Sequence, residues 1–388
     1  MTLRSKPLMM NLLRHSRGRQ TEMVRLLGEF VRCESPSHDK AAVDSFARIV
    51  AREWRRRGAT VRVLTQKKRG DLVRAELWLG EGKPDGQIMA LGHLDTVYPL
   101  GTIAGMPFHV TNGCAWGPGT FDMKGGIVLA LFAVDALRKA QFKPQKRLVF
   151  FWTSDEEIGS EASRSAIESE ARQSEAVLVL EPSFGRDGRL KTARKGVGMA
   201  EIVVTGRSAH AGIDPENGVN AVHELALQIA RLMELNDQRR GITVQSTVIS
   251  GGTVSNVVPE YARAEVDIRY ARMADARLLD RALHRIRPIL KGARVEVRGG
   301  INRPPLERTA AVQELFRHAQ SLMRDAGLSL DETATGGGSD GNLTAALGVP
   351  TLDGLGAVGD GAHSPREHVI IRKLPERAAL LAGLLATL

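Results

Sequence analysis

The stretch QIMALGHLD (residues 87–95) begins as an apolar run and ends with a histidine and an aspartate two positions apart. Such a run, bounded by turn residues, predicts a buried strand. On an extended chain His93 and Asp95 face the same side, and in open α/β sheets ligands gather where strands end. Further apolar runs follow at 147–153 and 176–180, and an apolar helix at 123–137 lies between the first run and the second. Together they predict an α/β fold with a mainly parallel sheet covered on both faces.

The pattern changes near residue 195. Strand and helix signals follow in the order βαββαβ, which is the order of a ferredoxin-like unit. Helix–strand alternation resumes after the Asn-Arg-Pro-Pro sequence at 302–305. We therefore predict one α/β domain formed by residues 1–194 and 305–388, interrupted by an inserted α+β domain at 195–304.

Composition and charge limit the class of protein and its expected location, although they exclude few functions. The chain has 388 residues and a formal net charge of +10. Residues 1–70 hold 17 Lys and Arg against six Asp and Glu, which permits nucleic-acid or anionic-membrane binding but more often marks a solvated surface. The sequence shows no stretch of roughly 20 apolar residues and no secretory signal. With only two cysteines, a cytoplasmic location is the expectation.

Four other segments place polar residues at turns or strand ends. Asp122 lies in WGPGTFDMKGG (116–126), Glu156 and Glu157 follow a strand in TSDEEIG (153–159), Glu181 ends the run LVLEP (178–182), and His363 lies in GAHSP (361–365). Each has a structural alternative, such as a helix N-cap for Asp122 or a solvated helix start for the acids. Glycines on both sides of Asp122 are not explained by an N-cap.

Together these segments supply two histidines and several carboxylates. This mixture suits zinc, cobalt or manganese in a two-metal site. A neighbouring free carboxylate can take a proton from water and pass it to a leaving amine. The set therefore predicts metal-assisted hydrolysis of an amide.

The same motifs, in this order and spacing, resemble the dizinc peptidases and deacylases that include glutamate carboxypeptidase of the carboxypeptidase G type, aminoacylase-1, succinyl-diaminopimelate desuccinylase and acetylornithine deacetylase. The resemblance runs from about residue 20 to the end. It implies a phosphorylase/hydrolase-like catalytic domain with an inserted lid and dimerisation domain. The first 18 residues or so lie outside the pattern.

The resemblance also implies residue roles. Asp122 would bridge two metal ions, with His93 and Glu181 completing one site and Glu157 and His363 the other. Glu156 would be the base that activates the bridging water, and Asp95 would orient His93. The peptide bond from Asp122 to Met123 would be cis.

For the inserted domain, the resemblance implies that His210 stabilises the oxyanion, that Asn256 contacts substrate and that Arg269 binds the substrate carboxylate. Gly338 and Ser339 match a substrate loop. Without the resemblance, the sequence favours a plain loop histidine at 210, and Arg269 has the alternative of an exposed strand residue.

The predicted function is hydrolysis of an amide to release a free amino acid, in the manner of a glutamate carboxypeptidase. The stretch HLDTVYP (93–99) and the Gly-Pro-Gly of 117–119 favour that branch. An N-acyl-amino-acid deacylase stays open, as does a non-catalytic metal-binding protein on a degenerate peptidase fold. The expected partners are a small-molecule or short peptide substrate with a free carboxylate and a second copy of the chain bound through 195–304. No nucleic acid and no membrane are expected.

Overall fold

The computed structural model describes residues 5–388. This part of the chain divides into two compact units, each described here by itself. The larger unit comprises the chain up to Ala193, Arg308–Ala334 and Ser339–Leu388, and the smaller comprises Arg194–Glu307 and Thr335–Gly338. No helix among the described residues is long and apolar enough to cross a membrane.

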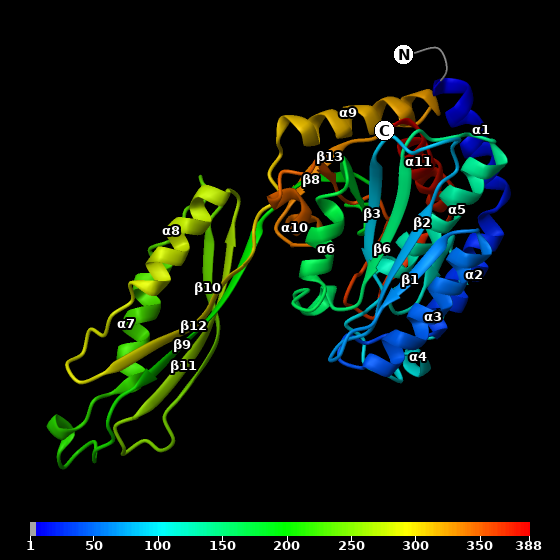
Figure 1. Ribbon diagram of the computed structural model, residues 1–388. Coiled ribbons are helices and arrows are strands. Elements are labelled where there is room, and N and C mark those ends of the chain that lie inside the picture. Colours follow the sequence, from blue (N-terminus) through cyan, green and yellow to red (C-terminus); the bar gives the residue numbers. More distant parts are fainter. Residues whose placement is uncertain (1–4) are drawn as a thin grey trace. The chain divides into compact units, whose positions relative to one another are not determined.

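A six-stranded sheet forms the centre of the larger unit, in the order β1-β2-β6-β3-β7-β14 (Figure 1). The pairs β6–β3, β3–β7 and β7–β14 are parallel, and β2 is antiparallel to both of its neighbours. The prediction of a mainly parallel sheet is confirmed. The strands are β1 (Thr60–Leu64), β2 (Leu72–Leu77), β3 (Gln87–His93), β6 (Arg147–Thr153), β7 (Ala176–Val179) and β14 (Thr351–Leu352).

Alternating side chains of the central strands enter two separate cores. In β3, Ile88 and Ala90 belong to the main core, whereas Met89 and Leu91 belong to the second one. Successive strand residues point to opposite faces, so helices must cover both faces for all of β3 to be buried. On the main-core side these are α1 (Ser5–Gly18), α2 (Gln20–Arg32), α3 (Lys40–Arg56), α5 (Gly125–Lys139), α9 (Ala310–Asp325) and α11 (Leu374–Thr387); on the other, α6 (Arg164–Ala171) and α10 (Gly341–Ala346).

Smaller elements complete the larger unit. A four-stranded sheet in the order β15-β16-β5-β4 carries the turn with His363 between two of its strands. Its strands are β4 (His109–Thr111), β5 (Cys114–Trp116), β15 (Gly359–Asp360) and β16 (His368–Ile370). The remaining elements are the short helix α4 (Thr102–Gly105) and the paired strands β8 (Leu190–Arg194) and β13 (Glu332–Thr335), whose last residues belong to the smaller unit.

The smaller unit is a four-stranded antiparallel sheet in the order β10-β11-β9-β12. Two helices pack against it around a core that includes Ile202, Leu225 and Leu279. Its elements are β9 (Gly196–Thr205), α7 (Ala221–Met233), β10 (Thr243–Gly251), β11 (Tyr261–Tyr270), α8 (Met273–His284) and β12 (Arg294–Arg303). Strands and helices thus alternate along the chain as βαββαβ.

The N-terminal segment is part of the larger unit rather than an extension. Helix α1 buries Met9, Leu12 and Leu13 completely or almost completely, and it packs against α11, α9 and α5. The spacing of these three residues places them on one helical face. The first 18 residues or so lie outside the family pattern, but their described part, from Ser5 onward, belongs to the fold.

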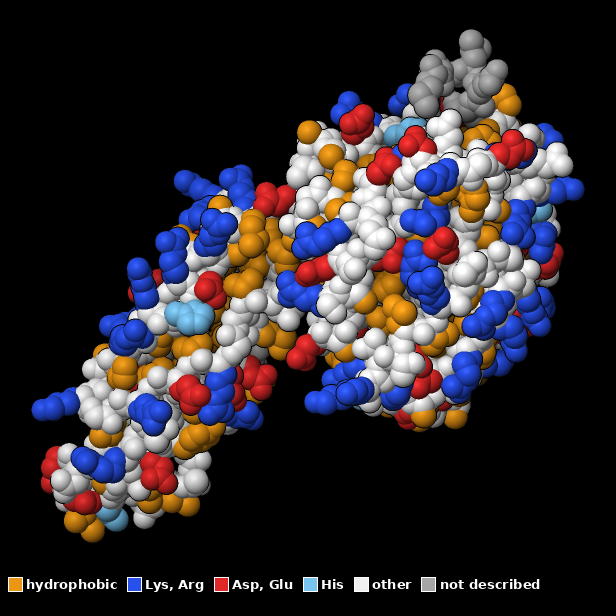
Figure 2. Space-filling model, viewed as in Figure 1, with side chains coloured by type: hydrophobic (Ala, Val, Ile, Leu, Met, Phe, Trp, Pro, Cys, Tyr) orange, Lys and Arg blue, Asp and Glu red, His pale blue; other side chains and the backbone are white. Residues whose placement is uncertain are grey.

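Several basic side chains of the first 70 residues form ion pairs. Lys40 pairs with Asp44 and Asp71, and Arg57 pairs with Glu53 and Asp135. On the face drawn in Figure 2, Lys and Arg side chains are spread over both units and interspersed with Asp and Glu. These contacts favour the reading of a solvated, structural surface.

Candidate metal centre

The predicted ligands lie where the central strands of the larger unit end. His93 is the last residue of β3, Glu156 and Glu157 lie in the turn after β6, and Glu181 comes just after β7. In the parallel register His93 is level with Thr153, and Leu91 is level with Val179. The strand ends therefore bring these side chains to one edge of the sheet.

His93 points one ring nitrogen at two carboxylates. Its Nε2 lies 3.2 Å from Asp122 Oδ1 and 3.3 Å from Glu181 Oε1. Its Nδ1 lies 2.9 Å from the carbonyl oxygen of Asp95. A carbonyl only accepts, so Nδ1 carries a proton and Nε2 can offer its lone pair to a cation.

His363 approaches the other side of Asp122. Its Nε2 lies 3.4 Å from Asp122 Oδ2 and 3.2 Å from Glu157 Oε2. The residue adopts a left-handed backbone conformation with φ of 59°, and its side chain is half exposed. Because Asp122 offers one oxygen to each histidine, it is placed to be shared between two cations. The peptide bond from Asp122 to Met123 is cis.

Glu156 joins the same cluster. Its carboxylate, that of Glu181 and a nitrogen of His93 offer atoms within 4.8 Å of one another. His93, Asp122 and Glu157 form a second such group. The two adjacent glutamates therefore both reach the cluster.

Asp95 makes more contacts than the sequence predicts, since it bonds to residues other than His93. Its carboxylate lies 3.4 Å from His93 Nδ1. The same carboxylate accepts the backbone N–H groups of Glu156 and Glu157, each at 3.2 Å, and the hydroxyl of Ser37 at 2.7 Å. Asp95 thus connects the end of β3 to the turn that carries both glutamates.

The cluster holds an excess of buried negative charge. Burial raises the pKa of Glu157 to about 8, and the nearby charges of Asp122 and Glu156 act in the same direction. Burial and Asp122 likewise raise the pKa of Glu181. Hydrogen bonds to Asp122 and Glu157 raise the pKa of His363 to about 10. Surroundings that favour an added proton also favour a divalent cation.

One buried atom tests whether these residues fit a metal. Glu157 Oε1 is buried and has no hydrogen-bond partner among residues 5–388. A buried carboxylate oxygen without a partner is costly. Together with two imidazoles and three further carboxylates, this atom gives a donor set that fits a pair of divalent ions.

Three predicted substrate residues belong to the smaller unit. His210 lies in an exposed loop, where its Nδ1 accepts the N–H groups of Gly212 and Ile213, both at 3.1 Å. Asn256 is also exposed, and its carbonyl accepts the N–H of Ala211. Arg269 on β11 forms a bidentate ion pair with Asp267.

The residues of the predicted substrate loop are divided between the two units: Gly338 belongs to the smaller one and Ser339 to the larger one. The Gly338 carbonyl accepts a hydrogen bond from Arg194 at 3.1 Å. Ser339 is fully buried, and its hydroxyl donates to Asp353 at 2.6 Å. The Ser339 side chain is thus engaged within the larger unit.

Sequence reasoning missed Glu367 and Tyr98. The Glu367 carboxylate is buried and accepts three backbone N–H groups from residues 119–122, including that of Asp122. The Tyr98 hydroxyl donates to Glu367 at 2.6 Å. Glu367 follows His363 by four residues, but its backbone donors are more than 240 residues away, so no local pattern indicates the contact.

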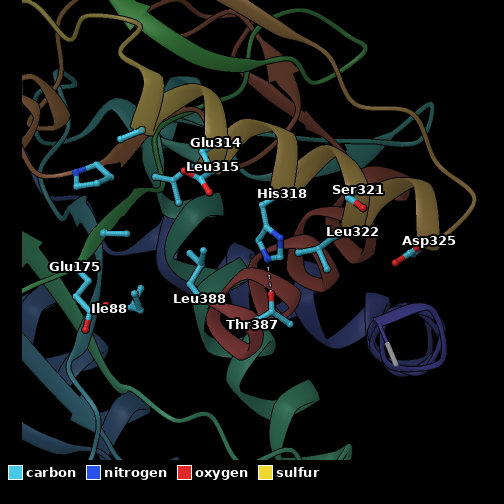
Figure 3. A pocket seen from close by; sticks show the side chains of 13 residues that line it. Ile88, Glu175, Glu314, Leu315, His318, Ser321, Leu322, Asp325, Thr387 and Leu388 are labelled. Atoms are coloured by element: carbon cyan, nitrogen blue, oxygen red, sulfur yellow. Dashed lines mark hydrogen bonds between the residues drawn. The ribbon is translucent and has the colours of Figure 1, made fainter. Parts of the chain in front are cut away.

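A cavity of about 460 Å³ lies away from this cluster. Figure 3 shows His318 and Leu322 of α9 facing Thr387, with Ile88 nearby. Ile88 and Ala176 stand at the beginnings of β3 and β7. The cavity is therefore at the opposite edge of the sheet from the predicted ligands, and it is not the site of the predicted chemistry.

Comparison with known proteins shows to which family the chain belongs. The sequence model of the family described as "Peptidase family M20/M25/M40" matches residues 89–387, which include all five predicted ligands. The chain belongs to this family. It is thus an M20 metallohydrolase, and the predictions of the family and of an enzyme are confirmed.

Relatives within the M20 family differ in their reactions. Carboxypeptidase G2 of Pseudomonas sp. (strain RS-16) is 31% identical over 95% of this chain and 90% of its own length. A succinyl-diaminopimelate desuccinylase of Dechloromonas aromatica is 27% identical over 80% of this chain and 86% of its own. The structure of aminopeptidase PepT from Bacillus cereus has a TM-score of 0.76 at 21% identity and covers 95% of this chain and 98% of its own. The last of these shows the fold alone.

Proposed function

We propose that the chain is a two-metal amidohydrolase that releases a free amino acid, in the manner of a glutamate carboxypeptidase. Two divalent ions would be held by Asp122 between them, by His93 and Glu181 on one side, and by Glu157 and His363 on the other. Zinc fits these ligands, as do cobalt and manganese. When bound, such a pair lowers the pKa of a shared water to about 7 and polarises a carbonyl. The unpartnered Glu157 Oε1 beside Asp122 and His363 carries this proposal.

Glu156 is the proposed general base. It reaches His93 and Glu181, whereas Glu157 contacts His363 directly. Glu156 would take a proton from the attacking water and give it to the leaving amine. Asp95, which accepts the N–H groups of both glutamates, would hold them in this arrangement.

The smaller unit is the proposed lid and dimerisation domain. His210 accepts two N–H groups at Nδ1, so its proton is on Nε2, where it can be donated to an oxyanion. The Arg269 guanidinium, which pairs with Asp267 in this structure, would bind a substrate carboxylate. Asn256 and Gly338 would contact the rest of the substrate. The edge strand β10 exposes Val248 and Ile249, which supports pairing with a second copy.

The substrate class is proposed from the relatives. The 31% identity with a protein named carboxypeptidase G2 supports an amide whose product is a free amino acid such as glutamate. The relatives named succinyl-diaminopimelate desuccinylase support a second candidate, the removal of a short acyl group from an amino acid. A cytoplasmic location stays a prediction.

The experiment compares Glu156→Gln with Glu161→Gln, an exposed glutamate in the same segment. Metal content is measured by mass spectrometry after zinc or cobalt is added, and turnover is measured on N-aroyl-glutamates and on N-succinyl and N-acetyl amino acids. We expect about two metal ions per chain in every protein. Turnover should fall about 10²–10⁴-fold in Glu156→Gln alone.

Three other outcomes of this experiment would support a different conclusion. Cleavage of only the short N-acyl substrates supports the deacylase. A wild-type chain that binds metal but hydrolyses none of these amides supports a non-catalytic metal-binding protein. Full activity of Glu156→Gln contradicts the assignment of the base.

A further inference from the structure

The buried carboxylate of Glu367 accepts four hydrogen bonds from two other segments of the chain. Its Oε1 accepts the N–H groups of Phe121 and Asp122 at 2.8 and 2.9 Å, and its Oε2 accepts the N–H of Gly119 at 3.0 Å. The residue has no exposed surface. A buried anion is stable only when donors surround it, so this carboxylate and the segment 119–122 stabilise each other.

Tyr98 extends this contact to a third segment. Its hydroxyl lies 2.6 Å from Glu367 Oε2 and 3.0 Å from the carbonyl oxygen of Ser364. Tyr98 follows His93 in the loop after β3, and Ser364 follows His363. Three segments that carry His93, Asp122 and His363 therefore meet at one carboxylate.

We propose that Glu367 is a positioning residue for the metal centre and that Tyr98 links it to the loop after β3. The inference rests on the proposed function, because it takes His93, Asp122 and His363 to be metal ligands. Glu367 contacts the backbone of Asp122 rather than its side chain, so it fixes the path of the chain while both Asp122 oxygens face the two histidines. Groups that orient ligands in this way tune metal affinity strongly.

The test uses Glu367→Gln, Tyr98→Phe and a matched control. Glutamine keeps the size of the side chain but turns one acceptor into a donor, which faces backbone N–H groups that also donate. The control is Glu224→Gln in the smaller unit. Glu224 is also fully buried and accepts the N–H groups of Ile289 and Leu290 and a side-chain N–H of Gln228, but it contacts none of the predicted ligands.

Two measurements separate positioning from stability alone. Cobalt affinity is measured by competition with a chelator, together with the visible spectrum of the bound ion. Amide hydrogen exchange at residues 119–122 is measured in the metal-free proteins. We expect Glu367→Gln to bind cobalt about 10–100-fold more weakly and to exchange faster at 119–122. Tyr98→Phe should lose less affinity, and Glu224→Gln should lose thermal stability while its cobalt affinity is unchanged.

The outcomes distinguish this inference from the proposed function. If Glu367→Gln binds cobalt as tightly as wild type, the inference is wrong. If that variant does not fold, Tyr98→Phe decides, and wild-type affinity together with wild-type exchange at 119–122 overturns the inference. A wild-type chain that binds no cobalt contradicts the proposed function instead, and faster exchange in Glu367→Gln would still show that the carboxylate fixes this segment.

Discussion

Gly126 stands in the first turn of α5, where two ligand-bearing segments approach it closely. A Cβ at this position would lie 2.3 Å from the carbonyl oxygen of Leu180 and 2.6 Å from Met123 Cε. Leu180 precedes Glu181, and Met123 follows Asp122. The absence of a side chain at this position therefore sets the separation of two predicted ligands.

Gly126→Ala should consequently weaken metal binding as well as stability. Backbone cannot yield as a flexible side chain does, so overpacking here should cost about 1–3 kcal/mol of unfolding free energy. Urea denaturation measures that loss and chelator competition measures metal affinity. Gly105→Ala is the control, because nothing lies within 4 Å of its added Cβ. Unchanged metal affinity in Gly126→Ala would show that the ligand segments do not depend on this approach.

Single residues differ in how far sequence predicts them. His93, Glu156, Glu157 and Glu181 follow apolar strands, so the rule that parallel strands end at one edge brings them together before any coordinates are known. Glu367 obeys no such rule, since its donors lie more than 240 residues away. Asp95 also accepts the N–H groups of the two glutamates. These hydrogen bonds depend on the distance between the ends of two strands, so the sequence pattern could not predict them.

Helix α1 shows the same limit at the scale of an element. Met9, Leu12 and Leu13 have helical spacing, but they lie outside the motifs that carry the family resemblance. What decides its place is the surface of α11, α9 and α5, on which α1 packs. That surface exists only after three distant segments have assembled.

Leu12→Ala tests whether α1 is an integral part of the larger unit. Leu12 is fully buried, so its truncation should lower the free energy of unfolding by about 2–5 kcal/mol. Met10→Ala is the matched control, because Met10 lies in the same helix and is 42% exposed. Urea titration of both variants measures the difference. Equal stability of the two would mean that α1 contributes little to the core.

At the scale of the whole molecule, the two units have separate hydrophobic cores. The four tryptophans, Trp54, Trp78, Trp116 and Trp152, all belong to the larger unit, and residues 194–307 contain none. Tryptophan fluorescence therefore reports the unfolding of the larger unit alone. Far-ultraviolet circular dichroism reports both units.

Metal removal should shift only those parts of the two signals that come from the larger unit. Metal at about 100 times its Kd stabilises the unit that binds it by about 2.7 kcal/mol. Adding EDTA should thus lower the thermal midpoint seen by fluorescence by about 5–10 °C. The part of the dichroism change that belongs to the smaller unit should keep its midpoint. A single transition that shifts equally in both signals would show that the units unfold together.

The connection between Glu367 and residues 119–122 also has a consequence for biosynthesis. The ribosome delivers Asp122 long before Glu367, and the whole smaller unit is translated in between. A nascent chain that has emerged only through β12 possesses four of the five proposed ligand segments but neither His363 nor the carboxylate that accepts the N–H groups of the Asp122 turn. The proposed pair of metal sites is therefore complete only after the C-terminal segment has been translated.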